Sequence, residues 1–177
     1  MSEKIVKEER EYSGKLLTLL KYRVLINGVE AVREVVEHPG AVAIIPIKDD
    51  GRIILVKQYR LPVGENLIEV PAGTLEKGES EEECARRELL EETGYEAGVL
   101  KKVRSLYLAP GYSTEKITIF IARKLSRGFQ KLESDENIEV LELGLEEALK
   151  MVKEGIIKDA KTIISIYDLV EELKHKE

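Results

Sequence analysis

Three glutamates within one short segment have the residue type and spacing of a divalent-metal site. Glu88 and Glu92 are four residues apart and Glu91 is three residues from Glu88, so on a helix all three project toward one side. Like charges at this spacing destabilise a helix by roughly a few tenths of a kcal/mol each unless cations compensate them. Clustered carboxylate oxygens are the ligands that Mg²⁺ and Mn²⁺ prefer. The segment therefore predicts a site for Mg²⁺, or for Mn²⁺ in its place.

Residues next to these glutamates would support such a site. Arg87 stands four residues before Glu91 and can pair with it while Glu88 and Glu92 face the ion. Gly73, in the loop before the helix, allows the backbone to approach the same ion. The competing interpretation is that EEECARRELLEE is a solvated acidic surface, which is the usual state of a Glu-rich helix.

The spacing of the whole segment from residue 73 to residue 95 argues against that interpretation. Its characteristic positions are, in order, Gly73, Glu79, Arg87-Glu88-Leu89, Glu91-Glu92, Gly94 and Tyr95. This pattern resembles the Nudix box along its full length, and its coincidence by chance is on the order of 10⁻⁸ per starting point. Tyr95 is the one departure, because the family usually has an aliphatic residue there.

The resemblance implies both a fold and a chemistry. The fold is an α/β/α sandwich with a mixed sheet, and the chemistry is hydrolysis of a diphosphate by water that divalent ions activate. Carried over by position, the metal ligands are Glu88, Glu92 and the carbonyl of Ala72, and Glu91 is a ligand or orients one. The residues that support these ligands are Arg87, Glu79 and Gly73.

Segments outside the box resemble one branch of the family, the ADP-ribose pyrophosphatases. These segments are VKQYRLPVG, LIEVPAGTLEKGES and LYLAPGYSTE, and the branch carries a proline about fifteen residues past the box, here Pro110. The resemblance implies hydrolysis of ADP-ribose to AMP and ribose 5-phosphate. The substrate contacts that it implies are Arg60, Glu69, Pro110, Gly111 and Glu115. The simpler alternative for the first two is an edge-strand cation and its ion-pair partner.

A general base is still required, and in this branch it comes from the polar loop before the last strand, here KLESDENIEV. Glu136 and Glu133 are the candidates, since Ser134 occupies a position where relatives often carry a second acid. Either glutamate accepts the proton from water, or Glu136 is a third metal ligand and Glu133 is the base. Acids in such loops are otherwise most often solvated.

The predicted elements surround the box helix with strands. Residues 16–26 and 29–38 read as a front hairpin with a type I′ turn, after a charged, aperiodic start. Residues 41–47 and 53–60 read as a second hairpin, and 66–70 as a short strand. Later strands are predicted over 99–109 and 116–125, and helices over 145–154 and 160–173. The expected organisation is an N-terminal β extension over 1–39, which in the similar branch builds a homodimer with a shared nucleotide site, and a catalytic α/β domain over 40–177.

Composition narrows the classes of function. With 28 basic and 34 acidic residues the net charge is −6, which disfavours nucleic-acid binding but permits a nucleotide bound through cations. Cys84 is the only cysteine, and neither a signal peptide nor a membrane span is recognisable, so the expected compartment is the cytoplasm. Abundant Lys and Glu with few Asn and Gln indicate a heat-adapted source. The alternatives are a pyrophosphatase for GDP-mannose, NADH or FAD, and a binding module that senses ADP-ribose without cleaving it.

Overall fold

The computed structural model describes residues 3–132 and 136–175 and contains two compact units. Unit 1 comprises Met1–Ala41 and Ser105–Ile117, and unit 2 comprises Val42–Arg104 and Thr118–Glu177. Within the described part, no helix has the length and apolar character needed to cross a membrane.

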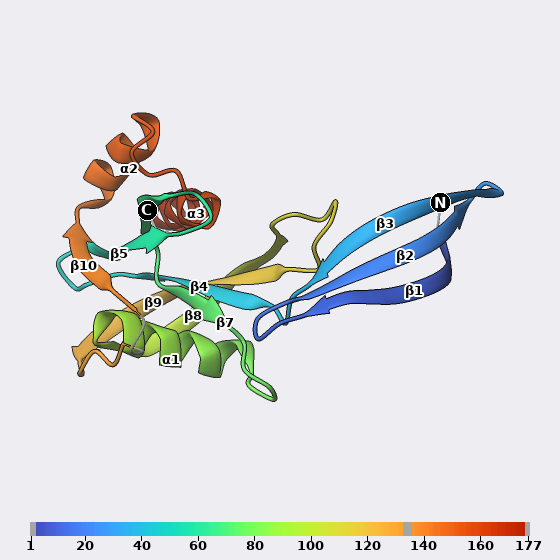
Figure 1. Cartoon of the computed structure of the whole chain (residues 1–177). Coiled ribbons are helices and arrows are strands. Elements are labelled where there is room, and N and C mark those ends of the chain that lie inside the picture. Colours follow the sequence, from blue (N-terminus) through green and yellow to red (C-terminus); the bar gives the residue numbers. More distant parts are fainter. Residues whose placement is uncertain (1–2, 133–135, 176–177) are drawn as a thin grey trace. The chain divides into compact units, whose positions relative to one another are not determined.

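Unit 1 contains an antiparallel sheet in the order β1-β2-β3 (Figure 1). Its strands are β1 (Lys4–Ser13), β2 (Thr18–Ile26) and β3 (Val29–Glu37). Asn27 and Gly28 join the last two with φ angles of 52° and 85°, as a type I′ turn requires, so the predicted front hairpin is confirmed.

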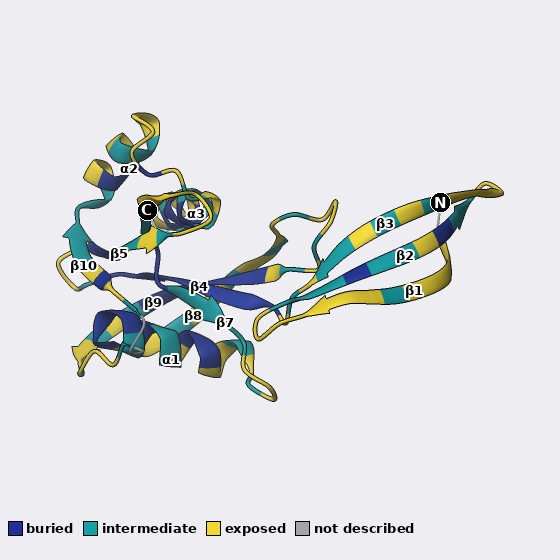
Figure 2. Cartoon of the chain, in the orientation of Figure 1, coloured by how far each residue is buried: buried dark blue, intermediate teal, exposed yellow. Residues whose placement is uncertain are grey.

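The charged start of the chain, which shows no strand periodicity in sequence, forms β1. Two register shifts, between Ile5 and Lys7 and between Arg10 and Tyr12, interrupt the alternation that would have revealed a strand. The strand is almost wholly exposed (Figure 2). It is therefore held by backbone pairing with β2 and not by an apolar face of its own.

Unit 2 contains two sheets, and consecutive strands along the chain can belong to different sheets. One has the order β7-β4-β9-β8 and the other β10-β5-β6. The strands of the first are β7 (Ala72–Thr74), β4 (Ala41–Pro46), β9 (Lys116–Arg127) and β8 (Tyr95–Tyr107). Those of the second are β10 (Ile138–Leu143), β5 (Ile53–Arg60) and β6 (Glu65–Glu69).

The second predicted hairpin is formed only at its turn, where Lys48 N–H donates to the Arg52 carbonyl at 2.9 Å and Ile47 bridges to Ile53. Beyond the turn, β4 and β5 belong to different sheets. Residues 41–46 are buried along their whole length, as are residues 53–56. Continuous apolar strands of this kind carry no alternation that could indicate their partners.

In the part of the chain that the structure describes, three helices complete the α/β/α sandwich, and the predicted fold class is confirmed. They are α1 (Glu81–Thr93), α2 (Leu145–Lys153) and α3 (Ala160–Lys174). Helix α1 lies against one face of the four-stranded sheet, and α3 lies on the other side (Figure 1). Cys84, Ala85 and Leu89 form the buried side of α1 and pack in one cluster with Val42 and Ile44 of β4.

Helix α1 begins and ends where the sequence indicates. Ser80 and Glu83 form a reciprocal capping box, and Gly94 ends the helix with a φ of 70°. These two caps fix the length of the helix, and the packing of its buried side fixes which glutamates face the loop that contains Gly73.

Candidate metal and diphosphate site

Glu88 of α1 fits against the backbone of Gly73. A Cβ atom at residue 73 would lie only 1.9 Å from the Cδ and Oε1 atoms of Glu88, a separation that no real Cβ shows. Gly73 therefore serves close approach, because its φ is not one that only glycine adopts. The loop and the helix together form a cradle for one carboxylate, which we call the Gly73–Glu88 cradle.

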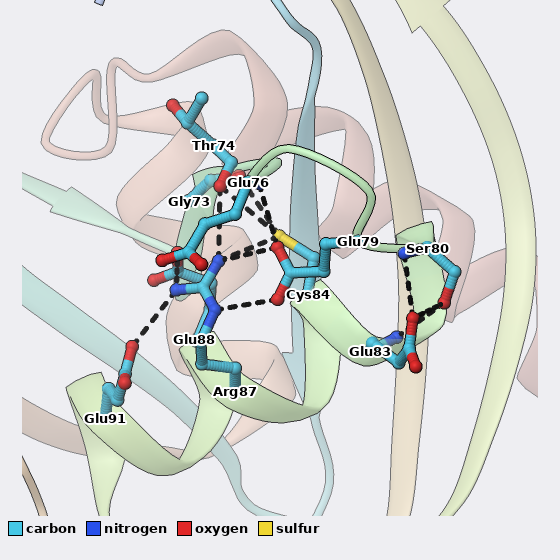
Figure 3. Close-up of polar contacts among 10 residues, drawn as sticks. All are labelled: Gly73, Thr74, Glu76, Glu79, Ser80, Glu83, Cys84, Arg87, Glu88 and Glu91. Atoms are coloured by element: carbon cyan, nitrogen blue, oxygen red, sulfur yellow. Dashed lines mark hydrogen bonds and ion pairs between the residues drawn. The ribbon is translucent and has the colours of Figure 1, made fainter. Parts of the chain in front are cut away.

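Arg87 organises the acidic side of the helix (Figure 3). Its Nε and Nη2 atoms donate to the two oxygens of Glu79 at 2.8 and 2.9 Å, and Nη1 donates to Glu88 at 2.6 Å and to Glu91 at 3.1 Å. Nη2 also donates to the carbonyl of Thr74 at 3.2 Å. One guanidinium thus ties the helix to the loop, and these hydrogen bonds hold the pKa of Glu79 at about 2.

Cys84, on the same helix, is a structural residue. Burial raises the pKa of its thiol to about 12, so the group is neutral at ordinary pH. Its Sγ donates to the carbonyl of Thr74 at 3.5 Å.

Glu92 is a buried carboxylate beside this cradle. Only 4% of the residue is exposed, and one oxygen accepts the N–H of Ala72 at 3.0 Å. Burial is the main cause that raises the pKa of Glu92 to about 8; the negative charges of Glu88 and Glu136 add to it, and the Ala72 N–H opposes it. Burial likewise raises the pKa of Glu88. Glu88 and Glu92 are buried, their pKa values are raised, and Glu136 lies near them, so this group of acids needs either protons or a cation.

The donor set fits a hard divalent cation. It offers carboxylate oxygens from Glu88, Glu91 and Glu92 together with the backbone of Ala72, and the Gly73–Glu88 cradle brings the first of these against the loop. Within the described residues, no three acidic, His or Cys side chains are grouped around one ion-sized position, and Arg87 bonds both Glu88 and Glu91. The fit therefore rests on donor chemistry and on the cradle.

The predicted base loop begins at the end of α1. Lys131 N–H donates to the Glu91 carbonyl at 3.1 Å, and the Gln130 side chain donates to the Glu92 carbonyl at 2.6 Å. Glu136 lies near enough to raise the pKa of both Glu88 and Glu92 by its charge. Glu133, the other candidate base, lies outside the described residues.

The two predicted substrate contacts from unit 2 form one partly buried ion pair. Arg60 donates from Nε to Glu69 Oε1 at 2.7 Å and from Nη2 to Oε2 at 2.9 Å. The Glu69 side chain is 2% exposed and that of Arg60 is 38% exposed, so the arginine alone presents a surface. The charge of Arg60 also lowers the pKa of Glu92, which places Arg60 close to the carboxylates.

Sequence reasoning missed Lys161, which is the second cation on Glu69. It lies in the first turn of α3 and also pairs with Asp159 Oδ1 at 3.0 Å. Asp159 is the N-cap of α3, and the spacing of Asp159 and Thr162 was the available signal for that cap. Nothing in the sequence indicated that Lys161 would meet a glutamate 92 positions away.

The remaining predicted contacts lie in unit 1. Pro110 and Gly111 are exposed, and the N–H of Glu115 donates to Ser113 Oγ at 3.1 Å. Their loop is held to β3, because Val36 N–H donates to the Tyr112 carbonyl at 2.7 Å and Thr114 N–H donates to the Val36 carbonyl at 3.0 Å.

Comparison with known proteins agrees with this geometry. Residues 37–164 match the model of the NUDIX domain. The chain belongs to the NUDIX domain family. The predicted resemblance is thereby confirmed, and members of this family generally use a divalent metal such as Mg²⁺.

Three relatives and one solved structure show the range of similar proteins. An ADP-ribose pyrophosphatase of Bacillus subtilis strain 168 is 46% identical over 94% of this chain and 91% of its own length. A methanol dehydrogenase activator of Bacillus methanolicus is 43% identical over 98% and 97%. A GDP-mannose pyrophosphatase of Yersinia enterocolitica is 38% identical over 78% and 77%. The crystal structure of an ADP compounds hydrolase has a TM-score of 0.88 at 26% identity, covering 99% of this chain and 96% of that one.

Replacing Gly73 should disrupt the cradle. In Gly73→Ala the added methyl group overlaps the Glu88 carboxylate, so this flexible side chain must swing away from the loop and out of its position in the cradle. Calorimetric titration with Mn²⁺ should show an affinity at least about tenfold lower than that of the unchanged protein. Gly144→Ala is the control, because a Cβ there meets nothing within 4 Å. Equal Mn²⁺ affinity in the two variants would contradict the cradle.

Glu92 should make stability depend on pH when a chelator removes divalent ions. The pKa of Glu92 in the folded protein is about 8, above its ordinary value of 4.5. Its contribution to the free energy of unfolding is therefore complete below pH 4.5 and is lost as the pH rises toward 8. Over this interval we expect the free energy of unfolding to fall by on the order of a few kcal/mol and the melting temperature to fall with it. Added Mg²⁺ should restore stability most at the alkaline end.

Glu92→Gln should flatten this pH dependence, because a neutral amide has no proton to lose. Glu82→Gln, at an exposed position of the same helix, is the matched control and should retain the full dependence. If calorimetry finds the same slope in both variants, Glu92 is not its source.

Proposed function

We propose that this protein hydrolyses ADP-ribose to AMP and ribose 5-phosphate in the presence of Mg²⁺. The observation that carries the proposal is the Gly73–Glu88 cradle beside the buried carboxylate of Glu92. Acidic side chains are buried in this way where a cation joins them to an anionic ligand. The similarity to an ADP-ribose pyrophosphatase over nearly the whole chain supports the choice of substrate.

The proposed ligands of the metal are Glu88, Glu92 and the carbonyl of Ala72, with Glu91 as a further ligand or an orienting group. When bound, the metal lowers the pKa of water and neutralises charge on the diphosphate. Arg87 and Glu79 keep the carboxylates in place, because Arg87 bonds Glu79, Glu88 and Glu91 at once. Mn²⁺ satisfies the same donor chemistry.

The base is proposed to be Glu136 or Glu133. The water oxygen forms a bond to phosphorus, the bond from phosphorus to the bridging oxygen breaks, and the base accepts the proton of the water. The charge of Glu136 already acts on Glu88 and Glu92, and this supports Glu136. The alternative in which Glu136 binds metal and Glu133 is the base uses the same loop.

Arg60 is the proposed contact for the substrate phosphates, since it is the partly exposed member of its ion pair. Glu69 is buried and bonded to two cations, and this supports a role in holding Arg60 in preference to direct contact. The loop with Pro110 and Gly111 remains the proposed contact for the terminal ribose, with Glu115 proposed to lie near the metals.

The two alternative functions are hydrolysis of a different nucleoside diphosphate derivative and binding of ADP-ribose without cleavage. The GDP-mannose pyrophosphatase relative supports hydrolysis of another sugar nucleotide or dinucleotide, such as GDP-mannose, NADH or FAD, by the same helix. A binding module that does not cleave ADP-ribose would not need the box carboxylates, and all four, Glu79, Glu88, Glu91 and Glu92, are present.

We further propose that the extension over 1–39 joins two copies of the chain into a homodimer in the cytoplasm. Its strands and the turn between β1 and β2 carry large apolar side chains that are each more than half exposed, and such side chains are usually covered in an assembly. They are Ile5, Val6, Tyr12, Leu16, Val29 and Val32.

Turnover assays test the proposed reaction. With Mg²⁺ we expect AMP and ribose 5-phosphate from ADP-ribose, at a higher kcat/KM than for GDP-mannose, NADH or FAD. Glu88→Gln and Glu92→Gln should each lower kcat by roughly 10²- to 10³-fold, the scale found when one group that stabilises transition-state charge is removed. Glu82→Gln is the control and should keep full activity.

The outcome against the proposal is tight binding of ADP-ribose without cleavage of any diphosphate tested, which would indicate a binding module. Among the loop variants, Glu136→Gln should lower kcat more than Glu133→Gln. The reverse order would identify Glu133 as the base.

Sedimentation equilibrium tests the proposed dimer. We expect twice the mass of one chain, and we expect Val32→Glu to yield the mass of one chain, because it places a charge among the exposed apolar side chains of unit 1. Ile156→Glu, at an exposed position after α2, is the control and should remain dimeric. A single-chain mass for the unchanged protein would refute the dimer.

A further inference from the structure

A chain of alternating charges leads from the surface of unit 2 to the start of α3. The order is Arg60, Glu69, Lys161 and Asp159, and each neighbour in this series is an ion pair. The middle pair is the most deeply buried, since the Glu69 side chain is 2% exposed and that of Lys161 is 13% exposed. Burial raises the pKa of Glu69, but the hydrogen bond from Arg60 and the charge of Lys161 more than offset it, so Glu69 is ionised.

The start of α3 also holds the backbone that follows Glu69. Thr162 Oγ1 accepts the N–H of Val70 at 2.8 Å and donates to Asp159 Oδ2 at 2.6 Å. Two residues later, the N–H of Ala72 donates to Glu92. Lys161 and Thr162 therefore bind adjacent residues of the segment that leads into the Gly73–Glu88 cradle: Lys161 binds the side chain of Glu69, and Thr162 binds the backbone of Val70.

The geometry points to Lys161 as a positioning residue that acts through Glu69 to present Arg60 to the substrate diphosphate. This inference rests on the proposed function, because it assigns a purpose to the partly exposed guanidinium of Arg60. Glu69 engages the Nε and Nη2 atoms of Arg60, so the edge formed by Nη1 and Nη2 is oriented for an anion.

Lys161 contributes in two ways. It bonds Glu69 Oε2, which fixes the plane of the carboxylate and hence the orientation of the guanidinium bonded to it. It also supplies a second positive charge, so that the negative charge of Glu69 is not compensated by Arg60 alone. Without Lys161, the negative charge of Glu69 would be compensated by Arg60 alone. The electrostatic attraction between Arg60 and a phosphate would therefore be weaker.

A double-mutant cycle tests this inference. The variants are Lys161→Met, Arg60→Ala and the double variant, and two quantities are measured: KM and kcat for ADP-ribose with Mg²⁺, and the Kd for ADP-ribose with Ca²⁺ in place of Mg²⁺. We expect Lys161→Met to raise KM and Kd about tenfold while kcat stays within about twofold. In the Arg60→Ala background the same substitution should have no further effect, since there is no arginine to position.

Two further variants separate positioning from a general loss of structure. Lys161→Arg keeps the charge and should restore KM to within about threefold of the unchanged protein. Lys158→Met is the matched control, because Lys158 also pairs with a glutamate of β6, Glu65 at 2.8 Å, but both side chains of that pair are about half exposed. It should change neither constant, and melting temperatures report folding in every variant.

Each other outcome overturns the inference in a recognisable way. If Lys161→Met raises KM and Kd equally with and without Arg60, or lowers kcat alone, Lys161 does not act through Arg60. If Arg60→Ala leaves KM and Kd unchanged, the inference fails while hydrolysis of ADP-ribose stands. If no diphosphate is cleaved, the proposed function fails, and the Kd cycle still decides whether Lys161 positions Arg60 for binding.

Discussion

The burial of acidic side chains against one loop is the constraint on which the site depends. Glu88 occupies the space that only a glycine at residue 73 leaves open, and Glu92 is almost fully enclosed beside it. Burying a carboxylate is costly unless a donor or a cation compensates it. Arg87 meets part of that need, and a divalent cation bound with the substrate diphosphate would meet the rest.

The rest of unit 2 keeps these groups in contact. Helix α1 is fixed by the capping box at Ser80 and by Gly94, and its buried side packs on β4. On the other side of the sheet, α3 holds the strand before the loop through Thr162 and Lys161. Helices from both outer layers therefore restrain one loop, and this restraint reduces the reorganisation needed when a ligand binds.

The comparisons and the geometry of the site both favour diphosphate hydrolysis, but they do not identify one substrate. The family match identifies the chain as a NUDIX domain protein, whereas the named relatives differ in what they act on. Because members of one family can act on different substrates, the residues that choose the substrate are sought outside the box helix. We propose Arg60 with its buried partners as one such group in unit 2, and the loop from Pro110 to Glu115 as another in unit 1.

The sequence by itself determined the box helix, its two caps, the front hairpin and the set of acidic candidates, because these depend on neighbours a few residues apart. Other features were decided only by the tertiary structure. Strand β1 is paired through a backbone whose bulges erase its pattern, and the apolar strands β4 and β5 enter separate sheets. Lys161 meets Glu69 across 92 positions. Such contacts depend on packing between segments that are distant in sequence, so the spacing of neighbouring residues cannot predict them.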